Sequence, residues 1–264
     1  MRVTEKNVDL RIQIVEMIRR AGEGHIPSSF SIIDILNVLY GSVLRFDPDL
    51  PDWPERDLFV LSKGHGAAAL YVTLAKYGLI DEDQIAAYGT AHGNLGGHPD
   101  VVSVPFIEAS TGSLGHGFPG AVGMALGLRI KGMLNRVYCL LGDGECHEGT
   151  VWEAANVAAN LELGSLVAIV DWNGSAAQLM PIDDLPAKWR AFGWQVHELD
   201  GHSTEGLRNC FRDLQLSAQG QPQAIIAHTV KGKGAKLLEG HGQWHHRIPT
   251  DEEWLLIKRE LQET

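Results

Sequence analysis

Two hydrophobic patterns alternate along the chain. Short apolar runs bounded by glycine or polar residues indicate buried parallel strands, and apolar residues at helical spacing indicate helices that pack on a sheet. The predicted strands are residues 58–61, 137–141, 166–170, 194–198 and 223–229. The predicted helices are residues 4–21, 32–44, 67–77, 81–88, 121–131, 148–161, 204–217 and 251–262. This alternation predicts an α/β fold with a parallel sheet and helices on both faces.

Some boundaries depend on single residues. Ser31 is expected to cap the helix over 32–44, with Asp34 at the capping-box position. Residues 174–188 are expected to form a loop, because polar and small residues interrupt the apolar pattern there. Because no internal repeat or clear linker divides the 264 residues, we expect one domain spanning 1–264.

The most informative stretch is a predicted βαβ unit. Its first strand ends in Gly142-Asp143-Gly144, and its second strand is followed by Asp171 and Asn173. In a right-handed unit the strands run parallel, so Asp143 and Asn173 leave the same edge of the sheet. Open α/β sheets bind ligands at that edge.

The residue types at this edge favour a particular ligand. Carboxylate and amide oxygens suit Mg²⁺ or Ca²⁺ when phosphate oxygens and water complete the coordination. Gly144 leaves room for a phosphate, and the following helix adds backbone N–H groups at its N-terminus. The unit therefore predicts a diphosphate held through a divalent cation.

Charge and cysteine usage narrow the function classes. A net charge of -11 argues against nucleic acid and anionic membranes as partners, so an anionic ligand requires a local positive site. No apolar run is long enough to span a bilayer, and we expect no targeting segment. Cys139, Cys146 and Cys210 lack paired spacing, which favours reduced thiols and a cytoplasmic location.

Two alternative sites compete with the diphosphate site. Gly115–Gly120 matches the dinucleotide fingerprint G-x-G-x-x-G, but the residues before it form a poor strand, which disfavours NAD. Cys146 and His147 could suggest a nucleophile or a metal pair. Adjacent positions rarely converge on one ion, so lining of the motif loop is favoured.

Histidines on glycine-rich loops add a second signal. Each one alone fits a hydrogen-bonded surface residue, whereas together they suit proton handling and recognition of hydroxyl groups near neutral pH. Their spacing does not favour zinc. They are His25, His65, His98, His116 and His245.

At these positions the chain resembles a known family. Gly-Asp-Gly followed by a distant asparagine is similar to the diphosphate-binding motif of thiamine diphosphate enzymes. Seven segments in order resemble the successive motifs of transketolases, over nearly the whole chain. They are Gly24–Pro27, Ser62–Gly66, Gly97–Pro99, Thr111–Gly115, Gly142–Gly144, Asn173 and Trp244–His245. The resemblance implies the thiamine diphosphate-binding fold.

The resemblance also implies roles for individual residues. Asp143, Asn173 and the backbone carbonyl of Ser175 would bind Mg²⁺. Gly144, Asn173, His65 and His245 would contact the diphosphate, and Gly112, Ser113 and Leu114 would meet the thiamine through their backbone. His25, His65, His98 and His245 would surround the donor sugar. Glu148 matches a glutamate that links paired active sites, although it also fits a charge at a helix N-terminus.

The implied reaction transfers a two-carbon ketol unit from a ketose, or its phosphate, to an aldose acceptor. The resemblance covers only the amino-terminal part of a transketolase and lacks the pyrimidine-binding domain. We therefore expect a split enzyme whose second subunit supplies that domain, assembled as an α2β2 heterotetramer. The alternatives are half of another thiamine diphosphate enzyme, such as a 2-oxo acid decarboxylase, and a non-catalytic regulatory subunit.

Two departures from the family pattern concern the substrate. Residues 175–181 read Ser-Ala-Ala-Gln-Leu-Met-Pro where the family usually continues toward Asp-Gly. His246 stands where glycine usually follows the motif histidine. Both positions would face the cofactor or the donor, so the resemblance leaves open an unusual ketose donor.

Overall fold

A computed structural model describes residues 7–217, 220–240 and 242–263 of the chain. The strands are β1 (Leu58–Leu61), β2 (Val137–Gly142), β3 (Leu166–Trp172), β4 (Gln195–Asp200) and β5 (Gln223–His228). The helices are α1 (Val8–Ala21), α2 (Ile26–Phe30), α3 (Ile33–Ser42), α4 (Ala67–Lys76), α5 (Glu82–Ala86), α6 (Gly117–Ile130), α7 (Gly149–Asn160), α8 (Leu185–Ala191), α9 (Thr204–Ser217) and α10 (Asp251–Glu263). Short 3₁₀ turns are η1 (Gly64–Gly66), η2 (Asp143–His147) and η3 (Ala176–Gln178).

The five strands form one sheet in the order β1-β2-β3-β5-β4, and every pairing is parallel. Gly142 at the end of β2 lies opposite Asp171 of β3, and Trp172 lies opposite His228 of β5. The carboxyl ends of β2, β3 and β5 therefore meet at one edge, as the predicted βαβ unit requires.

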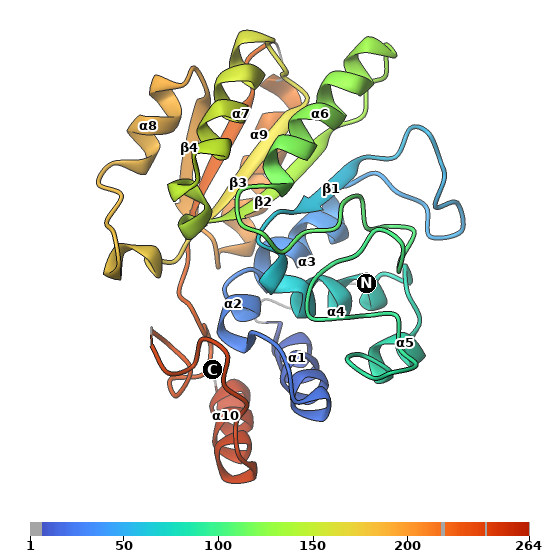
Figure 1. The fold of residues 1–264 in the computed structure, drawn as a ribbon, viewed down its shortest axis with the longest axis vertical. Coiled ribbons are helices and arrows are strands. Elements are labelled where there is room, and N and C mark those ends of the chain that lie inside the picture. The colour runs from blue at the N-terminus through green and yellow to red at the C-terminus, as the bar shows by residue number, and fades with distance from the viewer. Residues whose placement is uncertain (1–6, 218–219, 241, 264) are drawn as a thin grey trace.

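Side chains of successive strand residues enter two separate cores. Tyr138 and Leu140 belong to a core that they share with residues of α1, α3, α4, α9 and α10, whereas Val137, Cys139 and Leu141 belong to a core shared with α6, α7 and α8. Figure 1 shows α6 and α7 on the near face of the sheet and α9 on the far face, whereas α1 and α10 lie beyond the edge at which the strands end. The prediction of a parallel sheet with helices on both faces is confirmed.

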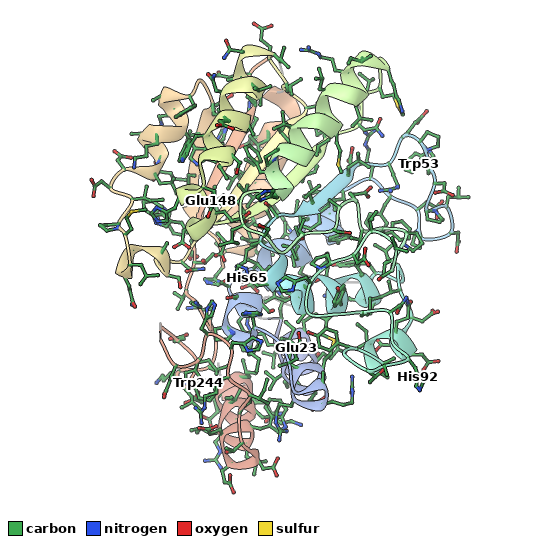
Figure 2. All side chains as sticks on the ribbon, viewed as in Figure 1. Glu23, Trp53, His65, His92, Glu148 and Trp244 are labelled. Carbon is green, nitrogen blue, oxygen red and sulfur yellow. The ribbon has the colours of Figure 1, made fainter. Side chains whose placement is uncertain are left out.

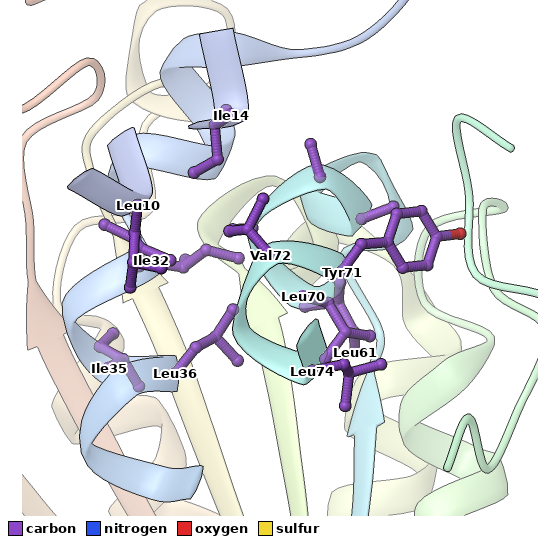
Figure 3. Close-up of a cluster of buried hydrophobic side chains, with 14 of the residues drawn as sticks. Leu10, Ile14, Ile32, Ile35, Leu36, Leu61, Leu70, Tyr71, Val72 and Leu74 are labelled. Atoms are coloured by element: carbon purple, nitrogen blue, oxygen red, sulfur yellow. The ribbon is translucent and has the colours of Figure 1, made fainter. Parts of the chain in front are cut away.

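Part of the first core lies between three helices. Figure 3 shows side chains of α1, α3 and α4, among them Ile14, Leu36 and Val72, filling the space between them. Each of these three side chains is fully buried. Burial of this kind contributes about 1.5–3 kcal/mol per large apolar side chain, so the packing of these helices stabilises the part of the chain that carries the loops of the site.

Several predicted boundaries differ from the structure. Helix α1 begins at Val8, and the predicted residues 4–6 lie outside the described part of the chain. The predicted cap at Ser31 is wrong, because its hydroxyl donates to Asp171 and helix α3 begins at Ile33 without a side-chain cap. Long-range pairing has replaced the local capping bond.

The predicted loop 174–188 contains a helix that the sequence prediction missed. Helix α8 begins after Asp184, whose carboxylate accepts the N–H of Ala187 at 2.8 Å. Pro186 lies in the first turn, where a missing N–H costs nothing. The Asp-Leu-Pro signal was present, but helix α8 is too short to show clear apolar periodicity.

Candidate functional site

A cleft of about 410 Å³ lies at the carboxyl ends of β1, β2, β3 and β5. Residues at the end of each strand or within three positions of it line the cleft. The lining residues are Ser28, Lys63, His65, Leu114, Gly142, Asp143, Gly144, Glu145, His147, Asn173, Ser175, Ala176, Leu179, Met180, Lys231 and His245. The cleft therefore occupies the position at which open parallel sheets bind ligands.

Asp143 and Asn173 both line this cleft, as the sequence predicted. The Asp143 carboxylate accepts the N–H of Gly144 at 2.8 Å and that of Ala176 at 3.4 Å. The Asn173 carbonyl oxygen accepts the N–H of Ser175 at 3.0 Å. These bonds orient oxygen atoms while leaving each oxygen a further lone pair.

A buried ion pair fixes the exit of β3. The fully buried carboxylate of Asp171 accepts hydrogen bonds from Lys63 at 2.5 Å and from the Ser31 hydroxyl at 2.7 Å. Thr229 also donates to it, and the Asn173 amide donates at 3.0 Å. The amide nitrogen of Asn173 donates to Asp171, so the side-chain carbonyl oxygen of Asn173 points away from Asp171.

Glu145 is a second buried carboxylate with a structural role at the cleft. It accepts the Ser62 hydroxyl at 2.6 Å, the N–H of Gly115 at 2.9 Å and that of Gly142 at 3.0 Å. Burial raises the pKa of its carboxyl despite these bonds. Glu145 thereby joins the ends of β1 and β2 to the segment that precedes α6.

The predicted donor-binding histidines gather around one ring. The ring centroid of His25 lies 5.5 Å from His65, 6.3 Å from His98 and 5.3 Å from His245. His246 is nearer still, at 4.6 Å. These residues come from four separate loops, so the fold brings together the histidines that the sequence could only list.

Burial and neighbouring positive charges lower the pKa of three of these rings, His25, His65 and His245. Burial first, and then the neighbouring His246 and His245, lower the pKa of His25 to about 4. Burial and the charge of Lys63 hold the pKa of His65 well below its usual range, and burial also lowers that of His245. Neutral imidazoles can both donate and accept hydrogen bonds, as recognition of sugar hydroxyls requires.

His25 has one notable unsatisfied atom. Its Nδ1 atom is buried and has no hydrogen-bond partner within the described residues. Buried polar atoms are nearly always paired in folded proteins. An unpaired nitrogen in this cluster fits a site that completes its hydrogen bonds when a ligand or partner is bound.

Lys231 supplies a positive charge that the sequence analysis did not assign to the site. Its ammonium group donates to the Ser175 hydroxyl at 2.8 Å and lies 3.1 Å from Nδ1 of His245. Burial first, and then the charge of Lys63, lower the pKa of Lys231. The unusual Lys-Gly-Lys-Gly run after the last strand was the available signal, and the expected local positive site lies there.

The remaining predicted residues fall on different parts of the cleft. Leu114 lines it, and Gly112 lies close to His98, where an added Cβ would come within 3.2 Å of the ring. Ser113 and Glu148 are exposed, and Glu148 is not among the lining residues. In the view of Figure 2, His65 lies between Glu148 and Trp244.

Neither alternative site has the local structure that its motif requires. No strand occurs in residues 101–116, so Gly115–Gly120 lacks the strand that a dinucleotide fingerprint must follow. Gly117 is instead required by packing, because an added Cβ would lie 2.7 Å from Cα of Ser62. His147 lines the cleft, whereas Cys146 is buried in the second core, so the two side chains do not face one common site.

The protein oxygen atoms at this edge could hold a cation only if a bound phosphate and water supplied further oxygen atoms. Within the described ranges, no group of three or more His, Cys, Asp and Glu side chains is arranged to hold a metal ion. Asp143 contributes one carboxylate beside the amide oxygen of Asn173, and burial raises the pKa of that carboxyl. Such a sparse oxygen set suits Mg²⁺ that keeps phosphate oxygens and water among its ligands.

Comparison with known proteins gives the same picture. A family profile described as "Transketolase, thiamine diphosphate binding domain" matches residues 4–262. A 6-deoxy-6-sulfo-D-fructose transketolase subunit of Clostridium sp. (strain MSTE9) is 39% identical, with 98% of each chain covered. An apulose-4-phosphate transketolase subunit of Phocaeicola vulgatus is also 39% identical, over 98% of this chain and 92% of that protein.

Solved transketolase structures share this fold, and the chain corresponds to a part of them. Transketolase from Campylobacter jejuni superposes with a TM-score of 0.90 at 27% identity, covering all of this chain but only 43% of that one. The part of the chain that the structure describes contains no helix with the length and apolar character needed to cross a membrane.

Proposed function

Because the chain belongs to the transketolase family and is a thiamine diphosphate-dependent transketolase subunit, we propose that its cleft binds the cofactor diphosphate through Mg²⁺. The observation that supports this most directly is the shared edge of Asp143, Gly144 and Asn173 beside two lysines. Asp143, Asn173 and the backbone carbonyl of Ser175 would hold the cation. Gly144, Asn173, His65 and His245 would contact the diphosphate.

The other residues around the cleft would hold the thiamine and the donor sugar. Gly112, Ser113 and Leu114 would contact the thiamine through their backbone, and Glu148 would take part in a link between paired active sites. When bound, thiamine diphosphate supplies the carbanion chemistry of ketol transfer. His25, His65, His98 and His245 would orient the donor hydroxyl groups and move protons at their ring nitrogens.

The lowered histidine pKa values and the names of the relatives support a proposal for the substrate class. One relative is named for 6-deoxy-6-sulfo-D-fructose and another for apulose-4-phosphate. We propose a ketose or ketose phosphate donor and an aldose acceptor, with transfer of a two-carbon unit. His246 and residues 175–181 would give this chain a donor preference of its own.

A partner subunit would complete the active site. The names of both relatives describe subunits, and the chain corresponds to less than half of a single-chain transketolase. We propose that a second chain carries the pyrimidine-binding domain and that two copies of each form an α2β2 assembly. Three free cysteines, two of them buried, suit a reducing cytoplasm.

Calorimetric titration tests the cofactor site. We expect the two-subunit complex to bind thiamine diphosphate only when Mg²⁺ is present. Asp143→Asn should weaken Mg²⁺-dependent binding by at least about 100-fold, because a carboxylate ligand is lost. Asp183→Asn removes an exposed acid from the adjacent loop and should leave binding unchanged. Binding that does not depend on Mg²⁺, or full binding by Asp143→Asn, contradicts the assignment.

A further inference from the structure

A buried carboxylate outside the cleft organises the segment that carries Lys231. Asp34 of α3 is 4% exposed and accepts hydrogen bonds from Asn7, Arg11 and His202. Burial alone would raise the pKa of Asp34, but the bonds from His202 and Arg11 lower it to about 2. Asp34 is therefore ionised at neutral pH and acts only as an acceptor.

His202 connects this carboxylate to the backbone beside Lys231. Its Nδ1 atom lies 2.8 Å from Asp34, and its Nε2 atom lies 2.9 Å from the backbone nitrogen of Val230. Because a backbone N–H can only donate, Nε2 accepts and Nδ1 carries the proton. The ring is thus held as one neutral tautomer by contacts at both nitrogens.

The other side of Lys231 is held through the same carboxylate. Arg11, which is paired with Asp34, donates from Nε to the carbonyl of Lys233 at 2.9 Å. Gly232 donates its N–H to Pro27 at 3.0 Å. Backbone atoms on both sides of Lys231 are therefore fixed by groups that lie behind the cleft.

We propose that His202 is a positioning residue that sets the Lys231 ammonium group for the anionic ligand of the cleft. A lysine ammonium group lies at the end of a flexible four-carbon stem, so the position of its backbone limits the points that its charge can reach. This inference rests on the proposed function, in which that ligand is the cofactor diphosphate. His202 is not among the residues that line the cleft, and it acts through its bond to Val230.

The test measures cofactor affinity and turnover separately in the two-subunit complex. His202→Phe removes both ring contacts, and His202→Asn keeps a donor for Asp34 while losing reach to Val230. We expect either variant to raise the Kd for thiamine diphosphate at fixed Mg²⁺ by about 10-fold, the effect of one charge-assisted contact. Turnover at saturating cofactor should stay within about 3-fold of wild type, because the donor-binding histidines are unchanged.

A double-mutant cycle shows whether the effect passes through Lys231. Lys231→Met alone should weaken cofactor binding, and adding His202→Phe should weaken it little further. His197→Phe is a matched control, because it removes a histidine hydrogen bond to Gln223 between the paired strands β4 and β5 and should not alter the Kd.

The outcomes separate this inference from the function on which it rests. The positioning role would be overturned if both His202 variants bound the cofactor as tightly as the wild type, or if the losses in the cycle were additive. The proposed function would still stand in that case, because the wild-type complex binds thiamine diphosphate. If the wild-type complex itself binds no thiamine diphosphate, the proposed function fails first. Measuring the unfolding temperature of each variant confirms that the compared proteins are folded.

Discussion

At the scale of single residues, His25 is the central member of the histidine cluster. Four other imidazoles lie within 6.3 Å of its ring centroid, and its Nδ1 atom is buried. A charge on this ring would be poorly solvated and would be repelled by charged neighbours. The ring is therefore neutral throughout the range in which ketose hydroxyls must be recognised.

Because the His25 ring is neutral in the folded chain, the free energy of unfolding depends on pH. The unfolded state binds a proton at His25 near pH 6.5, whereas the folded state binds it only near pH 4. Between these values the unfolded state holds more protons, so folding stability falls as pH decreases. At pH 5, allowing for partial solvent exposure, His25→Asn should recover about 1 kcal/mol of the unfolding free energy that wild type loses.

Urea unfolding of wild type and His25→Asn at pH 7 and pH 5 measures this difference. The exposed His92, which Figure 2 shows far from His65, offers a control whose substitution by Asn should leave the pH dependence unchanged. Parallel pH profiles for wild type and His25→Asn would show that the ring is protonated in the folded state.

His246 gives a prediction about specificity. Its ring lies 4.6 Å from that of His25, nearer than the rings of His65, His98 and His245. The resemblance to transketolases implies a glycine at this position. Removing such a contact costs about 0.5–1.5 kcal/mol, which corresponds to a change of up to about 10-fold. His246→Gly should raise the KM for the ketose donor by that factor and leave the Kd for thiamine diphosphate unchanged. If His246→Gly raised the KM for the donor and the Kd for thiamine diphosphate by the same factor, His246 would belong to the cofactor site instead.

At the scale of elements, local patterns predicted most strands and the edge that carries Asp143 and Asn173. The apolar runs over 137–141 and 166–170 became β2 and β3, because both strands are buried on both faces. Chain connectivity then placed the two polar residues together. Metal and diphosphate roles for them remain predictions that binding experiments must test.

Elements whose placement depends on distant partners could not be predicted in this way. Strand β5 lies between β3 and β4, and next to β3 it brings Lys231 beside Ser175. Nothing in the local sequence specifies strand order. For the same reason Ser31 was assigned to a cap, although the structure uses its hydroxyl to bind Asp171.

Helix α6 contains a pair of glycines that tests the packing at the cleft. A Cβ at Gly117 would lie 2.7 Å from Cα of Ser62, whereas one at Gly123 would have no neighbour within 4 Å. Gly117→Ala should therefore destabilise the chain by about 1–3 kcal/mol, because helix and strand must separate. Gly123→Ala should stabilise it by about 0.5–1 kcal/mol through helix propensity. Equal effects on the unfolding free energy would refute close packing of α6 on β1.

At the scale of the whole molecule, the charge distribution is uneven. The chain has a net charge of -11, and Lys63 and Lys231 line the same cleft as Asp143 and Glu145, with Lys63 paired to Asp171. Lys231 therefore places a positive charge at one point of an acidic protein, where a diphosphate could bind together with a divalent cation. This arrangement agrees with a small anionic ligand and explains why overall charge alone could not locate the site.

The rim of the cleft leads to a prediction about the partner subunit. Leu179 and Met180 are 93% and 56% exposed, and both line the cleft. Exposed apolar side chains beside a half-completed site are typical of a surface that another chain covers. We expect no ketol transfer by this chain alone and full transfer once the partner subunit is added.

Leu179→Asp should weaken that association without unfolding the chain, since the side chain has few contacts to lose. Burying an unpaired carboxylate at an interface costs several kcal/mol, so about 100-fold more partner should be needed for half-maximal activity. Leu134→Asp is the matched control, because Leu134 is 89% exposed and lies before β2, at the amino-terminal end of the sheet. Titrating each variant with the partner subunit distinguishes weaker association from lost catalysis. Excess partner restores the activity of Leu179→Asp only if Leu179 contributes to binding of the partner.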